Sequence, residues 1–92
     1  ICDMAQVYDM GVQIHVCGGP IATAAALQVE AAIPNFTIHE EHNANLKNIF
    51  IQAGKYYYKP ENGYYTVPDL PGIGQEMTDE FLATCRKVVI GG

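Results

Sequence analysis

The chain has 92 residues, 49% of them hydrophobic, and its ten acidic and five basic side chains give a formal net charge of −5. This length accommodates at most one small domain, and the apolar share is typical of a globular protein. The acidic charge disfavours nucleic acid and anionic membranes as partners, and no apolar run approaches the ~20 residues that a membrane-spanning helix needs.

The cysteines and the start of the chain bear on where the protein works. Cys2, Cys17 and Cys85 are odd in number and widely spaced, so neither a disulfide framework nor a CxxC redox motif fits them. The basic segment and apolar stretch of a signal peptide are not visible. We therefore expect a cytoplasmic protein. Because Ile1 stands inside a predicted helix, we also expect the chain to be a piece of a longer one.

The first 41 residues alternate between helical and strand-like patterns. Apolar residues at helical spacing predict a helix over 1–10, and the alternating β-branched residues of 12–16 predict a short strand. A Cys-Gly-Gly-Pro turn leads into an alanine-rich helix over 21–32, and a second strand is predicted over 36–40. Helices and strands alternating through tight links indicate a parallel α/β architecture, either a barrel or a doubly wound sheet.

Two polar residues fall where parallel α/β proteins bind their ligands, at the carboxyl ends of the strands. His15 lies near the end of the first strand and can act as a general acid or base. Glu40 ends the second strand, where a carboxyl group can donate to a developing oxyanion or hold a metal. Taken singly, His15 is more often a hydrogen-bonded structural residue, and Glu40 and Glu41 are more often solvated carboxylates.

The second half of the chain has a different character. Its start, 42–53, shows only weak periodicity. The tyrosine-rich segments 56–59 and 64–67 flank a turn with Asn-Gly, which predicts a hairpin. A proline- and glycine-rich stretch then predicts a stiff loop, and Thr78 is a candidate N-cap for a short closing helix. The apolar residues 88–90 suggest an edge strand.

A metal site and a phosphate loop are the weaker alternatives. The His-Glu-Glu-His stretch of 39–42 invites a zinc interpretation, but a strand would point His39 and His42 to opposite faces. Gly-Gly-Pro at 18–20 precedes a helix, yet it lacks the spacing of phosphate-binding loops.

The tyrosines and one cysteine suggest two further kinds of site, a ligand-stacking surface and a nucleophile. The tyrosines of 56–58 and 64–65 could stack on a ligand, although their alternating spacing favours cross-strand pairs. Cys17 lies two residues from His15 and is a candidate nucleophile, but no third orienting group is visible.

Several segments, taken in order, resemble the enolase superfamily, and most closely the mandelate racemase-like acid-sugar dehydratases of the galactonate and mannonate dehydratase type. They are the strand with His15, the Gly19-Pro20-Ile21-Ala22 turn, Ile33-Pro34-Asn35-Phe36 with Glu40, Val67-Pro68, and Pro71-Gly72-Ile73-Gly74. The resemblance implies the C-terminal part of a modified (β/α)8 TIM-type barrel, incomplete on its own. Within this single partial domain, 1–41 would form the last two strand–helix units, and 42–92 a C-terminal tail with a hairpin and a short helix.

The resemblance also implies a chemistry. Enzymes of this kind abstract a proton α to a carboxylate, stabilise the enediolate with Mg²⁺, and then expel a β-hydroxyl group as water. His15 matches an acid/base residue, and Glu40 matches the glutamate that stabilises the substrate carboxylate and its enolic form; Glu41 has no such match. The Mg²⁺ ligands are expected outside this chain, which alone would be inactive. The substrate would be a small sugar-acid carboxylate, and the parent protein a homo-oligomer.

Three other functions stay open at this point. A racemase or epimerase of the same superfamily would use the same histidine without losing water. A non-catalytic interaction module is suggested by the short chain and its tyrosine-rich hairpin. A metal-binding protein using His39 and His42 is the third.

Overall fold

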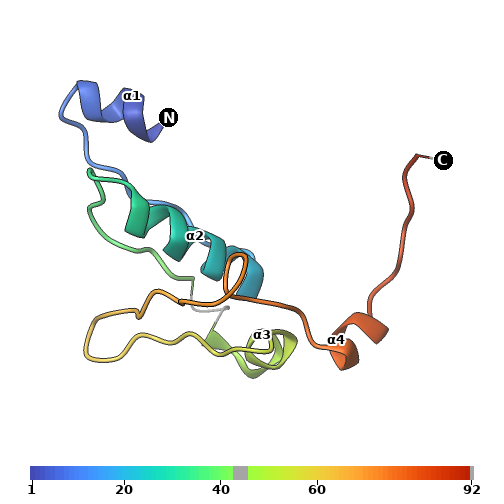
Figure 1. Ribbon diagram of the computed structural model, residues 1–92. Helices are drawn as coiled ribbons and strands as arrows, with labels where there is room; N and C mark the ends of the chain where they lie inside the picture. The colour runs from blue at the N-terminus through green and yellow to red at the C-terminus, as the bar shows by residue number, and fades with distance from the viewer. Residues whose placement is uncertain (43–45, 92) are drawn as a thin grey trace.

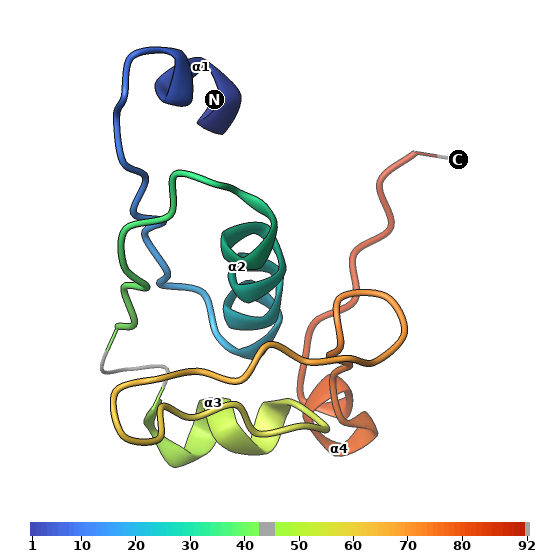
Figure 2. The same ribbon diagram turned by 60° about the vertical axis from the view of Figure 1, so that its left-hand side comes forward.

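The computed structural model describes residues 1–42 and 46–91 and contains four helices in this part of the chain. They are α1 (Cys2–Val7), α2 (Pro20–Ala32), α3 (Asn48–Ala53) and α4 (Asp79–Ala83). The segments 10–18 and 33–42 run beside α2, and α1 lies beyond its C-terminal end (Figures 1 and 2). Helix α3, the segment 54–78 and α4 lie below α2, and the C-terminal segment projects away from the helices (Figures 1 and 2). Among the described residues, no helix is both long and apolar enough to cross a membrane.

Helix α2, which the sequence predicts over 21–32, contributes most of the buried residues. Pro20 occupies its first turn, where a missing N–H costs nothing, and Gly19 precedes it with a φ of 81° that favours glycine. The helix ends at Ala32, and the next residue, Ile33, has the extended backbone that is favoured before a proline. Its buried residues are Thr23, Ala24, Ala26, Leu27 and Glu30.

The two predicted strands are extended segments rather than a regular ladder. One parallel bridge joins Val12 to Phe36, with hydrogen bonds from Val12 N to Asn35 O (2.8 Å) and from Thr37 N to Val12 O (3.0 Å). The prediction that two parallel segments lie side by side is therefore correct, but their regular pairing is much shorter than the predicted strands. Parallel strands are stable when buried and paired on both sides, and the one β-bridge of these segments among the described residues joins them to each other.

The predicted hairpin is present only at its turn. Asn62 and Gly63 both have positive φ, 52° and 81°, and Glu61 and Tyr64 exchange two backbone hydrogen bonds of 2.8 and 3.0 Å. These are the features of a type I′ turn, which Asn-Gly favours. The predicted pairing does not continue along the arms among the described residues. Instead, the Gln75 side chain pairs with the backbone of Tyr56 through bonds of 3.1 and 2.6 Å.

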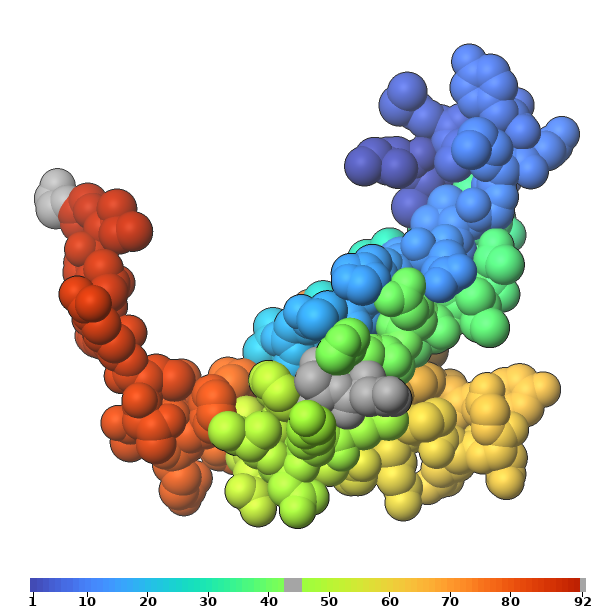
Figure 3. All heavy atoms as spheres, turned by 180° about the vertical axis from the view of Figure 1, so that it is seen from behind, coloured from blue at the N-terminus to red at the C-terminus, as the bar shows by residue number. Residues whose placement is uncertain are grey.

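The C-terminal part holds one predicted helix and one that the sequence did not reveal. Helix α4 begins after Thr78, whose hydroxyl accepts a hydrogen bond from Phe81 N at 3.3 Å, as the capping pattern predicts. Helix α3 was not predicted; it packs against α2 and α4 and buries Ala53 completely. The predicted edge strand over 88–90 is wrong for the described residues, because this segment is extended, exposed and projects away from the helices (Figure 3).

The buried core is small for the size of the chain. Its apolar members are Val16, Ala24, Ala26, Leu27 and Ala53. The accessible surface is 6893 Å², against about 5,200 Å² expected for a compact protein of this mass. The radius of gyration is 15.1 Å, against about 12 Å for a compact domain of this length. These residues therefore leave apolar surface available for packing against further structure. The barrel and the division of the chain at residue 41 stay predictions.

Candidate active site

His15 and Glu40, the two candidate catalytic residues, are in direct contact. His15 Nδ1 lies 2.5 Å from Glu40 Oε1, and the amide of Gln13 donates to the other oxygen, Glu40 Oε2, at 3.0 Å. The His15 side chain is 71% exposed and that of Glu40 is 36% exposed. The pair is therefore accessible to a small molecule, and both carboxylate oxygens of Glu40 already have a partner.

A shift in register between the two extended segments brings this pair together. At the start of the segments Val12 pairs with Phe36. At their end, His42 N donates to Val16 O at 3.2 Å. In a parallel arrangement this hydrogen bond pairs Val16 with Glu41, whereas the register of the first bridge would pair Val16 with Glu40. An extra residue of this kind is a bulge and moves the following side chains to the other face. It places Glu40 beside His15.

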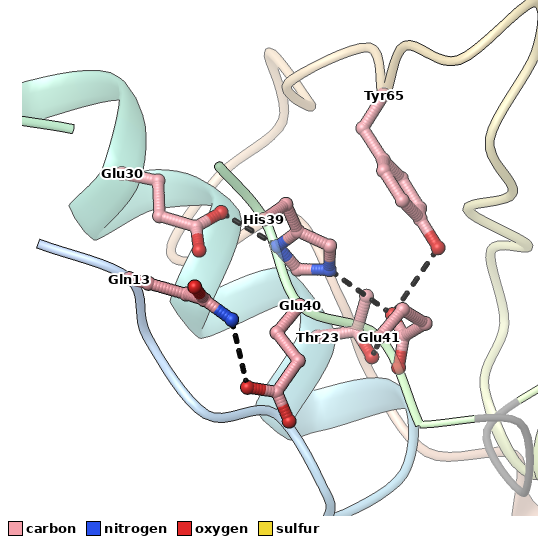
Figure 4. A network of polar contacts seen from close by, with 7 residues as sticks. All are labelled: Gln13, Thr23, Glu30, His39, Glu40, Glu41 and Tyr65. Atoms are coloured by element: carbon pink, nitrogen blue, oxygen red, sulfur yellow. Dashed lines mark hydrogen bonds and ion pairs between the residues drawn. The ribbon is translucent and has the colours of Figure 1, made fainter. Parts of the chain in front are cut away.

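The opposite face of the second segment carries a buried polar network (Figure 4). His39 contacts Glu30 of α2 through Nδ1, at 2.6 Å, and Glu41 through Nε2, at 3.2 Å. Glu41 Oε2 also accepts hydrogen bonds from the hydroxyl groups of Thr23 and Tyr65, each at 3.2 Å. Glu41 therefore belongs to a different set of contacts from its neighbour Glu40.

Burial also changes the acidity of Tyr65. Removal of its phenol from water is the main reason that its pKa rises above the usual value, and the nearby charge and hydrogen bond of Glu41 act in the same direction. Tyr65 is therefore a neutral hydrogen-bond donor to Glu41 throughout the neutral pH range.

A cavity of about 530 Å³ lies on the same side as this network. Glu30 and His39 line it together with apolar side chains of α2, the second extended segment and the hairpin. Glu30 Oε1 is buried there without a hydrogen-bond partner among the described residues. The cavity is separate from the contact between His15 and Glu40, which lies across the second extended segment.

The other candidates from the sequence are the metal site at His39 and His42 and the nucleophile Cys17. No group of three or more histidine, cysteine or acidic side chains within 1–42 and 46–91 could hold a metal ion. The two nitrogens of His39 face carboxylates on opposite sides of its ring, so these groups do not converge on one point. Cys17 is an exposed free cysteine.

Sequence reasoning missed Gln13, Thr23 and Glu30, and it named Tyr65 only as one of the tyrosines that could stack on a ligand or pair across the hairpin. Gln13 precedes His15 by two, so the alternation of a strand places it on the same face, and this signal was available. Glu30 stands out as an acidic residue inside an alanine-rich helix. Nothing in the local pattern of the hairpin distinguishes Tyr65 from Tyr64; only the fold brings it to Glu41.

Known proteins are similar to this chain in sequence and in fold. Residues 1–81 match the enolase C-terminal domain-like family. The chain is 34% identical to a D-galactonate dehydratase from Ralstonia pickettii over 92 residues, covering 95% of the chain and 24% of that enzyme. It is also 34% identical to a D-xylonate dehydratase from Haloferax volcanii over 76 residues, covering 80% of the chain and 18% of that enzyme.

Two solved structures contain the same arrangement of elements. A crystal structure of a member of the enolase superfamily from Salmonella Typhimurium is 61% identical and superposes with a TM-score of 0.86, over 90% of this chain and 21% of that one. An enolase of the mandelate racemase subgroup from Agrobacterium tumefaciens is 25% identical, with a TM-score of 0.77 over 90% and 22% of the two chains. The chain thus spans about a quarter or less of the length of the relatives it matches.

Proposed function

The chain belongs to the enolase C-terminal domain-like family, and from this premise we propose that it is the C-terminal portion of the catalytic barrel of a sugar-acid dehydratase. The contact of 2.5 Å between His15 and Glu40 carries the proposal, because it joins a proton-transferring group and a carboxyl group at the ends of two neighbouring segments. The D-galactonate and D-xylonate dehydratases among the relatives support a sugar acid as substrate.

His15 is the proposed acid/base residue. When its Nδ1–H donates to Glu40, its Nε2 presents a lone pair, and the exposed ring can receive a proton from a substrate. In the proposed reaction, the proton leaves the carbon next to the substrate carboxylate, and the electron pair of that C–H bond forms the enolic double bond. The hydroxyl group on the β-carbon then leaves with a proton as water.

Glu40 is the proposed contact to the substrate carboxylate and its enolic form. A carboxyl group can donate a hydrogen bond to a developing oxyanion only in its protonated form, and can hold a protonated partner only as the carboxylate. Here Glu40 accepts from His15 Nδ1 as a carboxylate; the proposed donation to the oxyanion requires that Oε1 gains a proton and turns from His15 toward the substrate. Gln13 keeps the second oxygen of Glu40 in place.

The proposed enzyme needs Mg²⁺, which would stabilise the negative charge of the enediolate. The residues described here do not provide a metal site, so we propose that its ligands lie in other parts of the parent protein. Assembly of the parent into a homo-oligomer likewise stays a prediction.

The test is an assay of the intact protein containing these residues, with D-galactonate, D-xylonate and related sugar acids in the presence of Mg²⁺. A dehydratase converts one of them to a 2-keto-3-deoxy acid, whereas a racemase or epimerase returns an isomer of unchanged mass. His15→Asn is expected to lower kcat by roughly 100-fold or more, in the range typical of general acid–base residues. Full activity of this variant would remove His15 from the mechanism.

A further inference from the structure

The imidazole of His39 is held on both ring nitrogens by buried carboxylates. Glu30, His39 and Glu41 have side chains that are only 4, 10 and 9% exposed. For both contacts of the ring to be hydrogen bonds, either the imidazole carries two protons and both nitrogens donate, or one carboxyl group is protonated and donates to the nitrogen without a proton. In both cases the three side chains share one negative charge, and the ring cannot turn without breaking a buried hydrogen bond.

Glu41 ties the same segment to two other parts of the fold. Its Oε2 accepts from Thr23 in α2 and from Tyr65 in the hairpin arm, each at 3.2 Å. The ring of Tyr65 also packs on that of His39, with centroids 4.7 Å apart. The residues immediately before and after Glu40 are therefore anchored to α2 and to the hairpin arm (Figure 4).

Such a network is expensive to bury. Moving charged side chains out of water costs several kcal/mol per ion, and well-packed apolar residues often stabilise a fold as well or better. Its more specific effect is on geometry. Because successive side chains of an extended segment point to opposite faces, holding His39 and Glu41 toward α2 turns Glu40 toward Gln13 and His15.

We propose that Glu30, His39, Glu41 and Tyr65 act as positioning residues that hold the Glu40 carboxylate against His15 and Gln13. The inference rests on the function proposed for Glu40, but its geometric part can be tested separately. A displacement of about 1 Å at a reacting group can cost roughly 100-fold in rate, so a rigid anchor on the far face has a direct catalytic consequence.

The first test follows the side-chain amide of Gln13 by NMR in the intact protein with ¹⁵N-labelled glutamine. Its signals are assigned with Gln13→Leu, and Glu40→Ala gives their position without the Glu40 contact. We expect His39→Leu to move the Gln13 signals toward the Glu40→Ala position, and Tyr65→Phe to move them less in the same direction.

Tyr64→Phe is the matched control, because it removes the hydroxyl of a neighbouring tyrosine that is 78% exposed. If His39→Leu does not fold, Tyr65→Phe decides. Unchanged Gln13 signals in the folded variants would overturn the inference.

The second test separates position from stability. Glu30→Gln keeps the shape of the side chain and removes its charge, and we expect kcat to fall roughly tenfold with KM little changed. Combined with Glu40→Asp, which already misplaces the carboxyl group, the two losses should be less than additive, because both act through the same group. Fully additive losses would contradict positioning through Glu40. Full activity of Glu40→Gln would instead refute the proposed function, while the Gln13 signals would still decide the geometry.

Discussion

The imidazole of His15 lies 2.5 Å from the carboxylate of Glu40, although the two residues are 25 positions apart in the sequence. The contact depends on the one-residue shift between the pairing of Val12 with Phe36 and that of Val16 with Glu41. Without the shift, Glu41 would occupy the face of His15 and Glu40 the other one. The shift therefore decides that Glu40, rather than Glu41, shares a face with His15, while the alternation of the extended segment separates Glu40 from the buried network.

Gln13 is expected to contribute to catalysis through its hydrogen bond to Glu40. Gln13→Leu leaves one oxygen of a partly exposed carboxylate without its donor, and we expect kcat to fall about tenfold, consistent with the loss of ~1.5 kcal/mol for a hydrogen bond to a charged group. Gln6→Leu makes the same change at an exposed position of α1 and should leave the rate unchanged. Equal rates for the two variants in steady-state assays of the intact protein would contradict this role.

Tyr65 makes the stability of the fold sensitive to alkaline pH. Its pKa is raised by burial, so above pH ~10 the unfolded chain loses the phenolic proton while the folded state retains it. The unfolded state then binds fewer protons, and the free energy of unfolding falls as pH rises. Tyr65→Phe should be less stable by about 1 kcal/mol at pH 8, through loss of the bond to Glu41, but should lose less stability between pH 8 and 11. Parallel pH dependences in urea unfolding would show that Tyr65 does not contribute.

Gly74 is expected to tolerate no side chain. Its φ is 79°, and a Cβ atom there would lie 2.6 Å from Pro68 Cβ, so Gly74→Ala combines backbone strain with a clash and should cost about 2 kcal/mol or more. Gly63 has nearly the same φ, 81°, but nothing lies within 4 Å of its Cβ position. Gly63→Ala should therefore cost only about 1 kcal/mol. If denaturant unfolding gives equal losses for both variants, the packing of Gly74 on Pro68 is unimportant.

Residues 1–92 expressed alone are expected to behave as an incomplete domain. Their surface exceeds that of a compact protein of the same mass, and large apolar side chains are exposed on α1 and the C-terminal segment. We expect binding of a hydrophobic dye, broad thermal unfolding and no turnover of sugar acids. A sharp unfolding transition without dye binding would favour the non-catalytic interaction module instead.

The sequence predicted the elements that depend on local chemistry. Pro20 in the first turn of α2, the cap at Thr78 and the Asn62-Gly63 turn each act within a few residues, and each was predictable. The resemblance to known dehydratases directed attention to His15 and Glu40, and their roles stay predictions.

The parts that escaped prediction depend on contacts distant in sequence. Helix α3 has six residues and is defined by its packing on α2 rather than by its own periodicity. The bulge before Glu41 and the contact of Tyr65 with the network leave no mark on hydrophobic alternation. The predicted strands lacked further neighbours among the described residues, and pattern alone does not reveal how many neighbours a strand will have.

The central claim is that Glu40, and not simply an acidic residue in this region, takes part in the chemistry. The most direct test is kcat of Glu40→Gln in the intact protein on its sugar-acid substrate with Mg²⁺, beside Glu61→Gln, which makes the same change on the exposed hairpin turn. We predict a loss of roughly 100-fold or more for Glu40→Gln and an unchanged rate for Glu61→Gln. A Glu40→Gln enzyme that turns over at the rate of the unaltered protein would contradict the account.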